Sequence, residues 1–158
     1  MRRTSYVVIA ALLFLQATVA GLIAHPWTFD ELMSKSDLIV IAERIATRDA
    51  GTKTEFTELR PPFPVVELNT DFKVLSALKG TPARAMLVLR HYRQDTDRLP
   101  GPVLNAPLGL DFSSGPTSVY LLFLQRESDD LYAPTSGHVF PEFSILVLPK
   151  GPLTVFPR

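Results

Sequence analysis

The sequence predicts an all-β protein with one short N-terminal helix, folded as a small antiparallel OB-like barrel of five or six strands. Short apolar runs recur along the chain, and turns rich in glycine and proline separate them. After the N-terminal helix no helical pattern lies between the runs, so helical crossovers and a parallel sheet are not expected. Closing the sheet into a barrel would remove its exposed edges.

The short helix is expected to begin after Thr28 and to end near residues 34–36. The Thr28 side chain can accept a hydrogen bond from the free N–H groups of the first turn, and Glu31 completes a capping box. Trp27 and Leu32 occupy the two positions of a hydrophobic staple, which would fix the angle at which the chain enters the helix.

The strands are expected where apolar and β-branched residues gather or alternate with polar ones. The polar residues 47–64 end in two prolines and predict a loop or a mobile edge hairpin. The connection over residues 94–117 is long, and connections of this length often carry function. The expected strands cover residues 37–45, 65–78, 86–92, 118–124, 131–134 and 143–148.

Residues 1–24 have the pattern of a secretory signal peptide. Two arginines precede an apolar run from Tyr6 to Ala20, and small residues follow it. Cleavage after Ala20 or after Ala24 fits this pattern. The alternative is an uncleaved membrane anchor, because the run from Tyr6 to Ala24 could just span a bilayer. Both readings place the rest of the chain outside the cytoplasm, in a secreted or periplasmic location.

These patterns divide the chain into a signal peptide over residues 1–24, a single barrel domain over residues 25–148 and a C-terminal tail over residues 149–158. The whole chain has 16 basic and 16 acidic residues, and the signal peptide holds two of the basic ones. The exported part is therefore slightly acidic, which argues against nucleic acid as a partner. A membrane is expected as a partner only if the signal segment stays uncleaved.

The chain contains no cysteine. This excludes disulfides, thiol catalysis, cysteine-ligated metal centres and lipid attachment through an N-terminal cysteine. The sequence also lacks the G-x-S-x-G, H-E-x-x-H, P-loop and G-x-G-x-x-G motifs. We therefore expect a protein that is not an enzyme and that uses no cofactor.

Candidate partner-binding residues lie in two places. One is the start of the exported chain, and the other is the segment 132–140, which proline and glycine residues shape into turns. The histidines offer a metal-binding alternative, since cleavage after Ala24 would give His25 a free amine that could hold copper together with its imidazole and a second histidine. The partner-binding candidates are His25, Trp27, Tyr132, Ser136 and His138, and the metal-binding candidates are His25, His91 and His138.

The order of landmarks resembles a known family. A short helix precedes residues 36–42 (SDLIVIA), and the later landmarks are residues 72–80 (FKVLSALKG), residues 120–124 (YLLFL) and the hairpin to residues 131–137 (LYAPTSG). Over roughly residues 26–140 this order resembles the netrin-like domains, which include the N-terminal domain of the tissue inhibitors of metalloproteinases. The nearest likeness is to small exported bacterial proteins of unassigned function.

The resemblance implies an OB-type barrel. It also implies an inhibitory N-terminus, but those inhibitors chelate the protease zinc through an N-terminal cysteine that this chain lacks. We therefore expect an exported β-barrel module that binds another exported protein or a polysaccharide. The alternatives are a metalloprotease inhibitor acting through its N-terminal segment and a small metal-binding protein.

Overall fold

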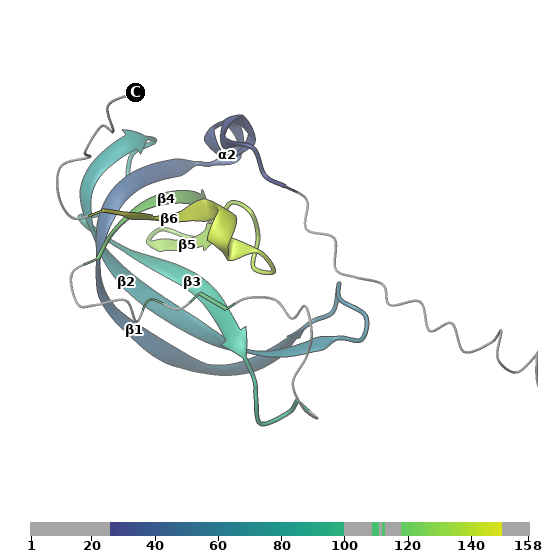
Figure 1. Ribbon diagram of the computed structural model, residues 1–158. Helices are drawn as coiled ribbons and strands as arrows, with labels where there is room; N and C mark the ends of the chain where they lie inside the picture. The colour runs from purple at the N-terminus through teal and green to yellow at the C-terminus, as the bar shows by residue number, and fades with distance from the viewer. Residues whose placement is uncertain (1–25, 100–108, 111, 113–117, 150–158) are drawn as a thin grey trace, which may run out of the picture.

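The computed structural model describes residues 26–99, 109, 110, 112 and 118–149 (Figure 1). The predicted signal peptide and most of the C-terminal tail lie outside these residues. In chain order the elements are α2 (Phe29–Lys35), β1 (Leu38–Phe56), β2 (Phe63–Lys79), β3 (Met86–Gln94), β4 (Val119–Arg126), β5 (Leu131–Pro134), the 3₁₀ helix η1 (Pro141–Ser144) and β6 (Ile145–Leu148).

The described strands form one sheet in the order β1-β2-β3-β5-β4-β6, and a further pairing joins β1 to β4. This pairing closes β1, β2, β3, β5 and β4 into a ring. The long strands β1, β2 and β3 sweep in a wide arc, and the shorter β4, β5 and β6 complete the structure (Figure 1). The all-β, OB-like barrel that the sequence predicts is therefore confirmed. All of its strand pairs are antiparallel except β3–β5, which is parallel.

Helix α2 begins as the sequence predicts. The backbone N–H of Glu31 donates to Thr28 Oγ1 at 3.2 Å, and the backbone N–H of Thr28 donates to Glu31 Oε2 at 2.9 Å. Leu32 is the buried residue of the helix, and Trp27 packs against the same cluster as Leu32, as expected for a hydrophobic staple. The helix thereby covers the outer side of Phe123 on β4.

The β1–β2 hairpin is much longer than the predicted strands. Residues 47–64, expected as a loop or a mobile edge hairpin, continue β1 to Phe56 and begin β2 at Phe63. The two strands stay paired from Thr47↔Thr70 to Phe56↔Phe63, with an irregularity between Asp49 and Lys53. Polar side chains are compatible with this because both faces of a hairpin that projects from a barrel can meet water.

The barrel interior is filled by alternate residues of the closing strands. Phe72 lies at its centre with no exposed surface, and its ring makes edge contacts with Phe112 at 5.5 Å and with Tyr120 at 5.7 Å between ring centroids. The buried residues of this cluster are Leu38, Val40, Ala42, Phe72, Leu87, Leu89, Phe112, Tyr120, Leu122, Leu124, Tyr132 and Ile145. Within the described residues, no helix is long and apolar enough to cross a membrane.

Candidate functional site

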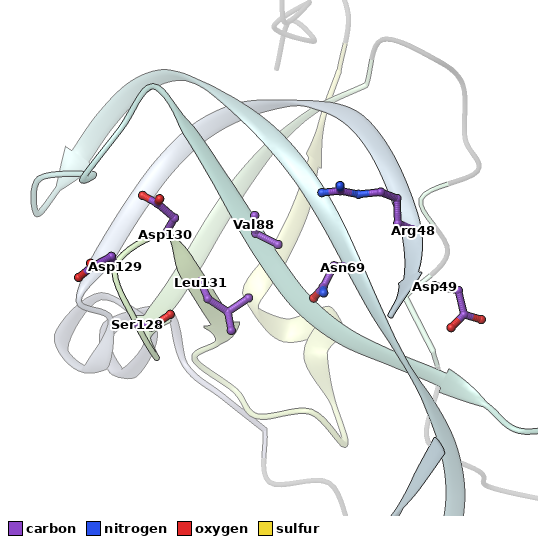
Figure 2. Close-up of a pocket in the computed structure, with 8 residues that line it drawn as sticks. All are labelled: Arg48, Asp49, Asn69, Val88, Ser128, Asp129, Asp130 and Leu131. Atoms are coloured by element: carbon purple, nitrogen blue, oxygen red, sulfur yellow. The ribbon is translucent and has the colours of Figure 1, made fainter. Parts of the chain in front are cut away.

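A hollow of about 540 Å³, which we call the outer groove, lies on the outside of the barrel (Figure 2). Strands β1, β2 and β3 supply one side of it, and the turn between β4 and β5 supplies the other. In Figure 2, Val88 and Asn69 lie between the turn residues and Arg48. The lining residues are Arg48, Asp49, Asn69, Val88, Ser128, Asp129, Asp130 and Leu131.

The strand register explains why Asn69 and Val88 face outward. Their neighbours Thr70, Leu87 and Leu89 are all at most 1% exposed and point into the core. Since successive side chains of a strand point to opposite faces, Asn69 and Val88 must lie on the outer face. Arg48 pairs with Asn69 in the register of β1 and β2, and so reaches the same face.

The β4–β5 turn is fixed against β3. The backbone N–H of Ser128 donates to the Leu131 carbonyl at 3.2 Å, which closes the turn. The backbone N–H of Val88 donates to the Asp130 carbonyl at 2.9 Å, and Val88 pairs with Leu131 where β3 and β5 run parallel. These bonds hold the acidic turn over the apolar side chains of Val88 and Leu131, so the groove is built before any ligand arrives.

Ion pairs surround the groove. Arg48 contacts Asp71 at 2.6 Å, Arg93 contacts Asp49 at 3.2 Å, and Arg84 contacts Asp130 at 3.1 Å. The pKa of Asp49 is lowered, chiefly because its carboxylate accepts a hydrogen bond from the backbone N–H of Gly51 and also because Arg93 is close. Exposed pairs of this kind contribute little to folding stability, and they leave the groove with both signs of charge.

Two oxygens in the groove have no hydrogen-bond partner within the described structure and are shielded from solvent: Asn69 Oδ1 and Asp130 Oδ1. A buried polar atom without a partner costs about 1–3 kcal/mol. Both atoms accept hydrogen bonds only, in the amide orientation assigned to Asn69. A ligand with N–H or O–H donors could reach the exposed carboxylate of Asp129, and it could reach the two shielded oxygens after a rotation of the Asn69 and Asp130 side chains.

His138, a predicted binding residue, adjoins this groove. Arg90 is the register partner of Asn69 and forms an ion pair with Glu127, whose Oε1 lies 3.9 Å from His138 Nε2. The His138 ring also packs edge-on against Tyr92, with centroids 4.8 Å apart. Burial lowers the pKa of His138 more than Glu127 raises it, so the ring is neutral at neutral pH.

Tyr132 was expected to contact a partner, and this prediction is wrong. Its side chain is 1% exposed and belongs to the barrel core, because β5 pairs with both β4 and β3 and turns Tyr132 inward opposite Leu89. Its outer neighbour Leu131 lines the groove instead. The proline and glycine pattern after it correctly predicted a turn, but the strand before that turn is buried.

Ser136 and Trp27 lie away from the groove lining. Ser136 donates to the Phe140 carbonyl at 2.8 Å and accepts from the Ser144 hydroxyl at 2.8 Å, which ties the turn to η1. Trp27 is half-buried beside α2, with the Lys35 ammonium 4.7 Å from its ring centroid. His25 lies outside the described residues.

Among the described residues, the candidate histidines of the metal-binding hypothesis do not come together. His91 points into the core, where its Nε2 hydrogen-bonds Thr70 Oγ1 at 2.8 Å. His138 contacts Tyr92 on the other face of the same strand, so these two rings are separated by the sheet. The residues that the structure describes contain no group of three or more His, Cys, Asp and Glu side chains that could hold a metal ion.

The groove residues Asn69, Asp129 and Asp130 were not predicted as binding residues. Asp129 and Asp130 lie in the connection between the expected strands 118–124 and 131–134, and Asn69 lies within the expected strand 65–78. Alternation along β2 could have placed Asn69 on an outer face. Nothing in the sequence indicates that the distant turn would lie opposite it.

Sequence comparison finds no protein-family model that matches the chain and no match among curated proteins. The netrin-like resemblance therefore stays a prediction, and the confirmed part of it is the barrel.

Proposed function

We propose that the protein is an exported, non-enzymatic β-barrel module that binds another macromolecule through the outer groove. The observation that carries the proposal is a hollow that is already formed and is lined by the exposed carboxylate of Asp129 beside the unpartnered oxygens of Asn69 and Asp130. The signal-peptide pattern of residues 1–24 supports export. The slightly acidic exported part argues against nucleic acid.

The partner that suits this groove has many hydrogen-bond donors and some apolar surface. Asp129 and Asp130 provide carboxylates at the turn, and Val88 and Leu131 provide apolar contact beneath them. The hydroxyl groups and C–H faces of a polysaccharide meet these requirements, and so do the N–H groups and side chains of another exported protein. OB barrels bind oligosaccharides, among other ligands, through one sheet face and adjoining loops, which adds fold-level support for a polysaccharide.

A pull-down with matched variants tests the proposal. The mature chain would be immobilised and exposed to the exported proteins and polysaccharides of the cell that produces it. Combining Asn69→Leu with Asp129→Asn removes an acceptor from the strand side and a charge from the turn side. Because each hydrogen bond to a charged or buried group contributes about 1–3 kcal/mol, we expect recovery of the partner to fall about tenfold or more.

Asp97→Asn is the control for charge loss. Asp97 is 84% exposed, contacts Lys53 at 3.5 Å and does not line the groove. Recovery with this variant should equal that of the unmodified protein. If the groove double variant, folded as judged by circular dichroism, recovers as much partner as the control, the outer groove is not the binding surface.

A further inference from the structure

A second hollow, of about 370 Å³, opens at one end of the barrel, and we call it the barrel mouth. It lies on the inner side of the curved sheet, because Thr47 and Leu68 alternate along their strands with Arg48 and Asn69 of the outer groove. It is thus separate from the proposed binding surface. Its lining residues are Arg44, Thr47, Leu68, Arg93, Gly109, Leu110 and Phe112.

One part of the barrel mouth is apolar and held in place by the core. Phe112 is 5% exposed, and its ring makes edge contacts with Tyr120 at 5.4 Å and with His91 at 5.0 Å between centroids. Leu110 packs against the same cluster, and Leu68 lines the hollow from β2. An apolar ligand group placed here would contact Leu68, Leu110 and Phe112.

The charged lining residues of the barrel mouth are both arginines. Arg93 is paired with Asp49 at 3.2 Å, so its charge is balanced. Arg44 has its Nε shielded from solvent without a hydrogen-bond acceptor in the described structure, and no carboxylate among these residues forms an ion pair with it. The two terminal nitrogens of the Arg44 guanidinium carry four further N–H donors, and these can pair with the two oxygens of a carboxylate.

Thr47 adds a fixed polar group to the wall. Its hydroxyl lies 2.8 Å from that of Thr70, which in turn hydrogen-bonds His91 Nε2 at 2.8 Å. This chain of three side chains holds Thr47 Oγ1 close to the inner face. Of the two described arginines that line the mouth, Arg93 has an ion-pair partner and Arg44 has none among the described carboxylates.

We propose that the barrel mouth binds a small amphipathic carboxylate. The carboxylate contacts the guanidinium of Arg44, and a short apolar tail packs against Leu68, Leu110 and Phe112. A hollow of about 370 Å³ falls in the range of roughly 300–1,000 Å³ that holds small ligands. The same chemistry occurs in a free fatty acid and at the C-terminus of a peptide that ends in an apolar residue.

Calorimetric titration of the protein, purified as its producing cell releases it, tests this proposal. The probes are octanoate, N-acetylphenylalanine, octanol and acetate. Octanoate or N-acetylphenylalanine should bind, and the one that binds more tightly identifies the source of the carboxylate. Octanol lacks the charge and acetate lacks the tail, so each should bind at least about tenfold more weakly than the better carboxylate.

The variant Arg44→Gln should weaken binding of that carboxylate about tenfold or more, because the charged hydrogen bonds are lost. Lys73→Gln is the matched control for loss of a positive charge, since Lys73 is exposed on β2 and lines neither hollow, so the affinity of this variant for the carboxylate should be unchanged. Binding of octanol or acetate as tight as that of the better carboxylate, or no binding of either carboxylate by the unmodified protein, would overturn the proposal even if Arg44→Gln fails to fold. Loss of partner recovery in the groove variants would not affect this result.

Discussion

Replacing Phe72 with alanine should destabilise the protein by about 4 kcal/mol, since buried Phe→Ala changes cost about 3–5 kcal/mol through lost apolar burial and the cavity that remains. Phe72 has no exposed surface and contacts the rings of both Phe112 and Tyr120. Its loss removes the common neighbour of these two rings. Urea unfolding followed by circular dichroism measures the change in the free energy of unfolding.

Leu78→Ala is the control on the same strand. Leu78 is 59% exposed, so its replacement should change the free energy of unfolding by no more than about 0.5 kcal/mol. Similar losses for Phe72→Ala and Leu78→Ala would contradict the barrel interior described above.

Lowering the pH from 6.5 to 4 should cost the protein about 3 kcal/mol of stability through His91 alone. Burial lowers the pKa of His91 from 6.5 to about 4, and the nearby charge of His138 lowers it further in the same direction. The ring is 1% exposed, and its Nε2 bonds Thr70 Oγ1 inside the barrel. Protonation there places a charge in the core without a partner.

The direction of this effect follows from proton binding. Between pH 6.5 and 4 the unfolded chain carries a proton on His91 that the folded chain does not, so acid favours unfolding. The contribution of His91 is fully present above pH 6.5 and is lost as the pH falls through 4. Below pH 4 both states bind the proton, and this residue adds no further pH dependence.

The variant His91→Gln isolates the contribution of His91 to the pH dependence of the free energy of unfolding. Glutamine can keep a hydrogen bond to Thr70 but cannot take up a proton. Between pH 6.5 and 4 the variant should therefore lose about 3 kcal/mol less stability than the unmodified protein. His138→Gln is the comparison. His138 is partly exposed and Glu127 opposes the lowering of its pKa, so this variant should reduce the pH dependence of stability less than His91→Gln does. Parallel curves for the unmodified protein and His91→Gln would show that His91 is not buried as a neutral ring.

Local signals in the sequence predicted much of the fold. The capping box of Thr28 and Glu31 depends on residues three apart, and the structure contains both of its hydrogen bonds. Alternation of polar and apolar residues correctly predicted the strand over residues 65–78, which lies within β2 and contains Phe72. The β1–β2 hairpin was underestimated, because its polar residues 47–55 carry no apolar period and are ordered by pairing with β2.

The candidate site could not be predicted because it depends on long-range pairing. Asn69 and Asp129 come together only because β3 pairs with β2 on one side and with β5 on the other. The β3–β5 contact joins Val88 to Leu131 in a short parallel register, for which the sequence carries no local signal. Tyr132 was misplaced for the same reason, since its burial depends on this pairing rather than on its neighbours in sequence.

The central claim is that the outer groove is the surface that contacts the partner, and site-specific photo-crosslinking tests it most directly. A photoreactive phenylalanine would replace Leu131, which lines the groove, or Leu78, which is exposed on β2 and does not line it. In the producing cell, illumination should yield a crosslinked adduct from position 131 and none from position 78. An adduct from position 78 with none from position 131 would contradict the claim and place the binding surface elsewhere on the barrel.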